Sequence, residues 1–232
     1  MSYKIMIKTM LKRIPVLGPC LVGIKHAIFG QTRFESSRAY WESRYDSGGN
    51  SGAGSYDKLA SFKADLINEF VKARGVDSVI ELGCGDGNQA SLGCYLSYLG
   101  FDISEKAIAT CRQRFGSDPS KEFRPMEDYR GEKGQLALSL DVVYHLVEDE
   151  VFQEYMGRLF GASTHYVIIY ASNYDQEPSP NAPHVRHRQF TSHIDTRFPS
   201  WDLIAHVPNR YPVARFNWGS FADFYIYERR AS

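Results

Sequence analysis

The sequence contains little cysteine, no net charge and no long apolar run near its N-terminus. Its 232 residues include four cysteines without C-x-x-C spacing, which fits neither a disulfide framework nor a zinc site and favours a reducing, cytoplasmic compartment. Lysine plus arginine equal aspartate plus glutamate at 27 each, so no overall positive field attracts nucleic acid. The longest charge-free stretch near the N-terminus, residues 14–24, is about half of the ~20 residues that a spanning helix needs.

The first 34 residues form a basic segment with interrupted helical spacing. No carboxylate precedes Glu35, and Pro15, Gly18 and Pro19 break the apolar pattern. One interpretation is an in-plane amphipathic anchor, with residues 1–30 contacting the inner surface of a membrane. The other is a helix that packs on the protein's own core or on a twin subunit. The sequence leaves the oligomeric state open.

From residue 57 onward, strand and helix patterns alternate. Because such alternation is typical of parallel sheets covered on both faces, we expect a Rossmann-like, doubly wound α/β fold. Its seven-stranded, mostly parallel sheet would end in a C-terminal antiparallel hairpin, and the N-terminal segment would add a helical extension. The expected strands are 78–82, 98–102, one ahead of residue 127, 135–141, 166–170, 201–208 and 221–228; the expected helices are 59–71, 104–115 and 151–160.

A glycine cluster, Glu81-LGCGDG-Asn88, directly follows the first expected strand. Glycines let the backbone turn sharply and approach a ligand, and in such sheets ligands bind at the carboxyl ends of the strands. The spacing is G-x-G-x-G, and Asn88 stands where a dinucleotide fold places its third glycine, so the pattern disfavours NAD. Asp102, at the end of the second strand, has a carboxylate that can accept hydrogen bonds from two ribose hydroxyls.

These segments resemble the motifs of class I S-adenosylmethionine-dependent methyltransferases. Residues 81–88 are similar to the family's first motif, 98–104 to its second, and 139–149 to the segment after its fourth strand. The short gap between Gly87 and Tyr98 departs from the pattern and leaves little room for the first crossover helix. The resemblance implies S-adenosylmethionine as the cofactor, bound by Glu81, Gly83, Cys84, Gly85, Gly87, Asn88, Gln89, Asp102, Ile103, Asp128, Tyr129, Leu140 and Asp141.

A narrower likeness is to bacterial methyltransferases associated with cell-surface polysaccharide assembly. It rests on residues 40–56 and on His184-VRHRQ-Phe190. The likeness implies a glycan or other small-molecule acceptor, with a phosphorylated compound among the candidates, and gives no role to nucleic acid.

A second glycine-rich stretch, residues 48–55, lies ahead of the methyltransferase motifs. The helix expected after Asp57 should run antiparallel to the first strand, which brings this loop to the cofactor edge of the sheet. The loop lacks the lysine of a Walker motif. It is either a lid over the cofactor or a cradle for an anionic acceptor, and a flexible linker is the alternative. The chain thus divides into residues 1–34, a lid segment 35–56 and a methyltransferase domain 57–232.

The acceptor side is expected in the long loop 173–189. Two guanidiniums and two imidazoles within residues 184–188 can grip a phosphate or carboxylate, unless they pair with Asp175 and Glu177 as a solvated loop. Metal binding by His184, His187 and His193 is not expected, because no nearby carboxylate completes a set. The candidate acceptor-binding residues are Tyr40, Arg44, Asn50, Ser51, His184, Arg186, His187 and Arg188.

Catalysis would be methyl transfer to a hydroxyl. His145 is the first candidate for the general base because an imidazole's ordinary pKa lies near neutral pH, with Tyr144 second and Asp141 beside the sulfonium. A histidine at this position can also serve only in packing. The sequence therefore predicts an O-methyltransferase that acts on a phosphorylated or glycan acceptor. The alternatives are a protein or nucleic-acid N-methyltransferase and a non-catalytic accessory subunit that binds the cofactor.

Overall fold

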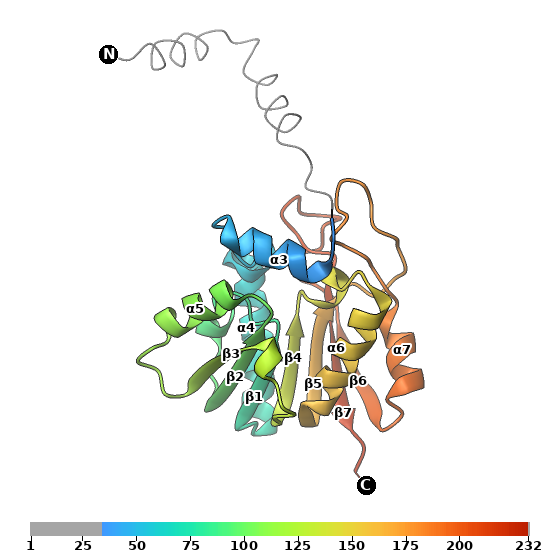
Figure 1. The fold of residues 1–232 in the computed structure, drawn as a ribbon. Coiled ribbons are helices and arrows are strands. Elements are labelled where there is room, and N and C mark those ends of the chain that lie inside the picture. Colours follow the sequence, from blue (N-terminus) through green and yellow to red (C-terminus); the bar gives the residue numbers. More distant parts are fainter. Residues whose placement is uncertain (1–33, 232) are drawn as a thin grey trace, which may run out of the picture. The chain divides into compact units, whose positions relative to one another are not determined.

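The computed structural model describes residues 34–231, whose strands form one seven-stranded sheet (Figure 1). The strand order is β3-β2-β1-β4-β5-β7-β6, with β1 to β5 parallel and β7 antiparallel to both β5 and β6. This arrangement confirms the predicted fold class. The strands are β1 (Ser78–Leu82), β2 (Ser97–Asp102), β3 (Lys121–Pro125), β4 (Gly134–Leu140), β5 (Ser163–Ala171), β6 (Trp201–Val207) and β7 (Asp223–Arg229).

Helices cover both faces of the sheet. Phe224 of β7 contacts Phe62 of α4, whereas Tyr227 contacts Phe160 of α6, and side chains an odd number of positions apart point to opposite faces of a strand. The α4 and α6 helices therefore lie on different faces. The helices are α3 (Ser37–Asp46), α4 (Asp57–Arg74), α5 (Glu105–Arg114), α6 (Asp149–Gly161) and α7 (Phe190–Arg197).

The chain between β1 and β2 contains no α-helix. A single 3-10 turn, η2 (Ala90–Leu92), takes the place of the first crossover helix. The few residues between Gly87 and Ser97 explain this, because they have to return to the start of β2. The carboxyl end of β1 is consequently covered by segments from elsewhere in the chain.

Two of the helices and the last strand differ from the sequence expectations. No helix was predicted over α3 or α7, and both are short with weak apolar periodicity. The last strand begins at Asp223 rather than Phe221. Phe221 lies in the loop before this strand, where its ring packs edge-on against the Tyr144 ring.

The predicted anchor in residues 1–30 lies outside the described residues. Within residues 34–231, no helix is both long and apolar enough to cross a membrane.

Candidate cofactor and active site

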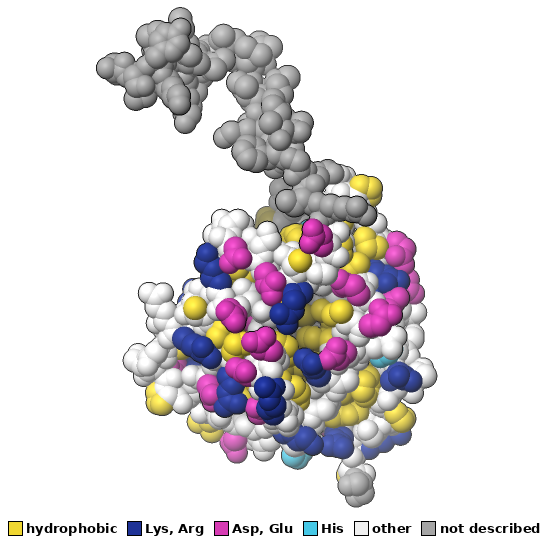
Figure 2. Space-filling model, viewed as in Figure 1, with side chains coloured by type: hydrophobic (Ala, Val, Ile, Leu, Met, Phe, Trp, Pro, Cys, Tyr) yellow, Lys and Arg dark blue, Asp and Glu magenta, His cyan; other side chains and the backbone are white. Residues whose placement is uncertain are grey.

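A cavity of about 320 Å³ opens at the carboxyl edge of the central strands. Its wall combines the loop after β1, the ends of β2 and β4, the inner side of α3 and the glycine loop 48–55. On the same face, Figure 2 shows apolar side chains gathered in a hollow between charged ones. This volume is within the range of small-molecule sites, which are roughly 300–1,000 Å³.

The two glycine-rich loops contact each other at this cavity. Gly85 has a left-handed backbone (φ 58°), and a Cβ there would lie 2.2 Å from Ser51 Oγ. The Ser51 amide donates to Asp86 Oδ2 (3.1 Å), the Asp86 amide donates to Ser51 Oγ (2.9 Å), and the Tyr56 hydroxyl donates to Asp86 Oδ2 (2.6 Å). The first loop is therefore a fixed part of the cavity wall and not a flexible linker.

The α3 helix crosses over the ends of the central strands (Figure 1), and four of its side chains line the cavity. At its start, the Ser37 amide and hydroxyl donate to the Glu148 carboxylate at 2.8 and 2.6 Å. At its end, Lys106 Nζ of α5 donates to the Asp46 carbonyl at 3.2 Å. Trp41 and Tyr45, one helical turn apart, face the cavity. Both ends of α3 are thus hydrogen-bonded to other parts of the chain, and the helix forms one side of the cavity.

Asp102 stands at the end of β2 and lines the cavity. Its Oδ2 accepts from the Gly85 amide and its Oδ1 from the Ser104 amide, each at 2.9 Å. Burial raises the pKa of Asp102 to about 6. Each oxygen keeps a second lone pair, so the carboxylate can still accept two hydroxyl hydrogen bonds.

Three further residues predicted to bind the cofactor, Glu81, Cys84 and Gln89, also line the cavity. Gln89 donates from Nε2 to the Ala60 carbonyl (3.1 Å), while its buried Oε1 has no hydrogen-bond partner among the described residues. Burial raises the pKa of Glu81 to about 7, and this carboxyl accepts from the Tyr98 hydroxyl at 2.6 Å. Burial also raises the pKa of the Cys84 thiol. Gly83, Ile103 and Leu140 complete the lining on this side.

Other predicted cofactor residues lie outside the cavity wall. Asn88 donates to the Ser55 carbonyl (2.7 Å) and accepts from Arg114, and Gly87 packs against Phe115. Asp128 is exposed, and the Tyr129 hydroxyl donates to the Glu132 carbonyl (3.3 Å). Met126, which starts the same 3-10 turn as Asp128, lines the cavity instead.

Asp141 is held by a lysine that the sequence analysis missed. Lys63 of α4 is fully buried, and its Nζ lies 2.5 Å from Asp141 Oδ2. The Tyr144 hydroxyl donates to Asp141 Oδ1 at 2.7 Å. Burial raises the pKa of Tyr144, which makes it a poor base. The sequence did contain a signal that Lys63 is buried, because it lies on the apolar stripe of its helix, four residues after Leu59.

His145 lines the cavity, but its expected pKa is wrong. Burial lowers the pKa of His145 to about 4, because the imidazolium loses its hydration against Trp41, Tyr144 and the His184 ring. Nδ1 lies 3.0 Å from the His184 carbonyl oxygen. A carbonyl only accepts, so Nδ1 carries the proton and Nε2 presents a lone pair.

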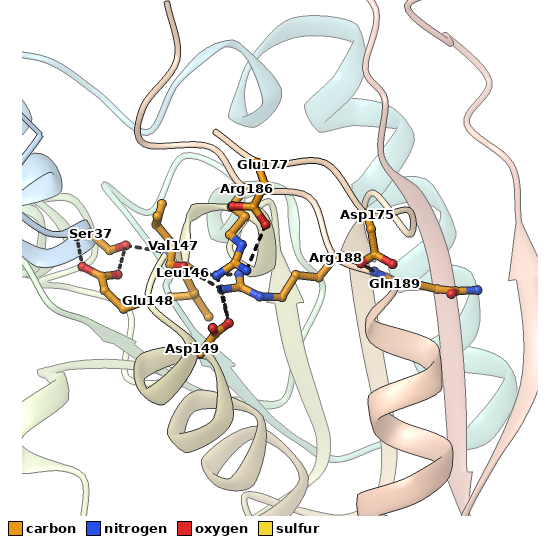
Figure 3. A network of polar contacts seen from close by, with 10 residues as sticks. All are labelled: Ser37, Leu146, Val147, Glu148, Asp149, Asp175, Glu177, Arg186, Arg188 and Gln189. Carbon is orange, nitrogen blue, oxygen red and sulfur yellow. Dashed lines mark hydrogen bonds and ion pairs between the residues drawn. The ribbon is translucent and has the colours of Figure 1, made fainter. Parts of the chain in front are cut away.

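The two arginines expected to grip an acceptor are bonded within the protein (Figure 3). Arg186 donates to the Val147 carbonyl (3.1 Å), Asp149 (2.9 Å) and Glu177 (3.1 Å). Arg188 donates to the Leu146 carbonyl, the Val147 carbonyl (2.6 Å) and Asp149 (2.9 Å). The guanidiniums thus fix the 173–189 loop to the segment ahead of α6.

The remaining predicted acceptor residues are also engaged with protein groups. Arg44 donates from Nε to the Asn50 carbonyl at 2.7 Å, which shapes the glycine loop. His187 is buried, and its Nδ1 lies 2.6 Å from Ser172 Oγ. The Tyr40 ring stacks on the His184 ring at 4.0 Å. In residues 34–231, no group of three or more His, Cys, Asp or Glu side chains could hold a metal ion.

The fold is that of class I S-adenosylmethionine-dependent methyltransferases. The methyltransferase domain of bacterial CtHen1 is 17% identical over 75% of this chain and 100% of that domain, with a TM-score of 0.59. Magnesium protoporphyrin IX methyltransferase from Synechocystis PCC 6803, solved with S-adenosylhomocysteine, is 16% identical over 83% and 97%, with a TM-score of 0.58. A methyltransferase from Clostridium acetobutylicum is 12% identical over 83% and 98%, with a TM-score of 0.55. No protein-family model matches the sequence, and the search of curated proteins gave no match.

Proposed function

We propose that this protein is an S-adenosylmethionine-dependent methyltransferase that acts on a small-molecule or glycan acceptor. The observation that carries the proposal is the cavity formed at the Gly83 and Gly85 turns, whose wall includes Gln89, a side chain with a buried Oε1 that has no hydrogen-bond donor within residues 34–231. A buried acceptor without a donor costs free energy, so a ligand with N–H or O–H groups is expected there.

The residues present fit the proposed cofactor. Gln89 Oε1 can accept from an ammonium group, Asp102 from the two ribose hydroxyls, and the apolar side chains of Ile103, Met126 and Leu140 can pack on a planar base. Bound S-adenosylmethionine would supply a methyl group on a positively charged sulfur. The carboxyl groups of Glu81, Asp102 and Asp141 line the cavity, and those that are ionised favour such a cation.

On the acceptor side, His145 is a hydrogen-bond acceptor more than a strong base. Its Nε2 lone pair can accept from a hydroxyl and orient the oxygen toward the methyl group. With a pKa of about 4, the imidazole has little driving force to take the proton fully. The protein's own contribution to the reaction is therefore mainly positioning and exclusion of water beneath α3.

The finer proposal is an acceptor from bacterial surface polysaccharide assembly. It rests on the likeness of residues 40–56 and 184–190, and these segments meet where the Tyr40 and His184 rings stack at 4.0 Å with planes 8° apart. Membrane contact through residues 1–30 belongs to the same proposal. Deletion of these residues should abolish binding to anionic liposomes while the affinity for the cofactor is kept. A truncated protein that loses the cofactor would refute the anchor.

Calorimetry with S-adenosylmethionine and S-adenosylhomocysteine tests the cofactor assignment. Saturable binding at one site per chain is expected, and no binding of either compound would refute it. Transfer of a labelled methyl group to nucleotide sugars and lipid-linked glycans then tests the acceptor class. Cofactor binding without transfer to any acceptor would favour an accessory role, and transfer to protein or nucleic acid would favour the N-methyltransferase alternative.

A further inference from the structure

Lys63 places a full charge where the packing of α4 would otherwise require an apolar side chain. The side chain is 0% exposed, yet its ammonium lies 2.5 Å from Asp141 Oδ2 and 5.2 Å from the centre of the Tyr170 ring. Burying an ammonium is costly unless a partner compensates it. The retained charge therefore needs an explanation through Asp141.

Asp141 is constrained from several directions. It has a left-handed backbone (φ 62°), although it is not a glycine. Lys63 and the Tyr144 hydroxyl each donate to one of its oxygens. Gly54 of the glycine loop approaches so closely that a Cβ there would lie 2.7 Å from Asp141 Oδ2. Together, these contacts fix the orientation of the Asp141 carboxylate.

In this orientation, the Asp141 carboxylate forms part of the cavity wall. Asp141 lines the cavity and its side chain is 12% exposed, whereas Lys63 does not line the cavity. The ion pair is thus a dipole with its negative end toward the cavity, where Glu81 and Asp102 add two more carboxyls. The cationic side chains in the lining, Arg38 and Arg158, are paired with Glu42 and Glu154.

We propose that Lys63 is a positioning residue that holds the Asp141 carboxylate at the cavity wall, and that this carboxylate makes the site prefer cationic S-adenosylmethionine to S-adenosylhomocysteine, whose sulfur is uncharged. The inference rests on the proposed function. Methyl transfer removes the positive charge from the sulfur, so a carboxylate that favours the cation also weakens retention of the product.

The measurement is the ratio of the dissociation constants of S-adenosylhomocysteine and S-adenosylmethionine, obtained by calorimetry on the full chain. Asp141→Asn should lower this ratio roughly tenfold, because one nearby charge is lost. Lys63→Met should lower it to the same value, because the Tyr144 hydroxyl then holds only Oδ1 and the carboxylate can turn away from the cavity wall. In the Asp141→Asn background, Lys63→Met should change it less than about twofold. Lys72→Met, an exposed lysine of the same helix, is the matched control.

Each other outcome overturns the inference. A purely structural lysine would weaken both affinities equally and leave the ratio unchanged. A rise in the ratio for Lys63→Met would show that the ammonium acts on the ligand by its own charge. Should Lys63→Met not fold, comparing Asp141→Asn with the double variant decides the same point, because the double variant contains neither buried charge. A difference beyond about threefold between those two variants contradicts action through Asp141.

A cofactor-free measurement separates this inference from the proposed function. In urea unfolding, each single variant should be less stable than the double variant, since each strands one buried charge. Wild-type protein that binds neither compound would refute the proposed function and the charge preference together. Cofactor binding by the wild type, together with a ratio that is unchanged in Lys63→Met, would refute only the role of Lys63.

Discussion

The cofactor side and the acceptor side of one sheet edge use their polar side chains in opposite ways. On the cofactor side, Gln89 Oε1 has no partner in the part of the chain that the structure describes, and each Asp102 oxygen accepts from one amide and keeps a lone pair free. On the acceptor side, Arg186 and Arg188 each donate to three protein oxygens. The cofactor side thus keeps oxygen lone pairs free for a ligand, whereas the two arginines of the acceptor side are already engaged with protein oxygens.

The difference shows what identifies a binding residue. A charged side chain at the ligand edge is a candidate by position, and unused hydrogen-bonding capacity in the cavity wall shows which of the candidates can still bind a ligand. By this criterion, the guanidiniums of the 173–189 loop stabilise the loop, and binding capacity concentrates around residues 81–102. Four substitutions test this contrast.

The largest effect is expected at the cradle between the two glycine loops. Gly85→Ala adds a Cβ 2.2 Å from Ser51 Oγ on a left-handed backbone, so it disturbs both the turn and its contact with the lid segment. Affinity for S-adenosylmethionine should fall more than about 100-fold, or roughly 3 kcal/mol, by calorimetry. The control is Gly157→Ala in α6, where an added Cβ meets nothing within 4 Å. It should leave affinity unchanged, and equal losses in both variants would contradict the cradle.

Asp102→Ala should have the next largest effect. It removes the acceptor for the ribose hydroxyls, at a cost of about 1–3 kcal/mol in cofactor binding. Asp102→Asn should cost less, because the amide oxygen still accepts one hydrogen bond. Asp128→Ala is the comparison variant, since that side chain is exposed and lies outside the cavity wall. A larger loss for Asp128→Ala than for Asp102→Ala would show that the cavity has been assigned to the wrong residues.

The sequence predicted the fold and the residues that reach the cavity edge better than it predicted side-chain pairing, for a physical reason. Strand and helix periodicity depends on local patterns, and Gly83, Gly85 and Asp102 follow strands directly, so their positions in the sheet follow from topology. The roles of Lys63 and Arg188 depend on contacts with residues 78 and 39 to 42 positions away. No local pattern reports such pairing, and none reports the burial that lowers the pKa of His145.

His145 gives a third, smaller effect, on acid stability. The pKa of His145 is about 4 in the folded protein, against about 6.5 in an unfolded chain. Between these values the unfolded chain binds a proton that the folded protein does not, so stability falls as pH falls. The wild type should lose roughly 2 kcal/mol through this group between pH 7 and pH 5, and His145→Gln should not.

Urea unfolding of the two proteins at both pH values measures the difference. Glu81 and Asp102, whose pKa values are raised, act with the opposite sign, but they are present in both proteins and cancel in the comparison. Identical pH dependence would mean that His145 titrates normally, which would restore it as a base near neutral pH.

The smallest effect on cofactor binding is expected at the acceptor-side arginines. Arg188→Ala should leave affinity for S-adenosylmethionine within about twofold, while it lowers the free energy of unfolding by about 1–3 kcal/mol, because the Leu146 carbonyl loses its guanidinium donor and the Val147 carbonyl keeps only Arg186. Asp149→Ala sharpens the test, since both guanidiniums then lose their shared carboxylate. Inorganic phosphate should bind weakly to Asp149→Ala and not to the wild type, because two freed guanidiniums can chelate it. Phosphate binding of equal strength in both proteins would mean that the arginines are already available, and the acceptor side would then be as open to a ligand as the cofactor side.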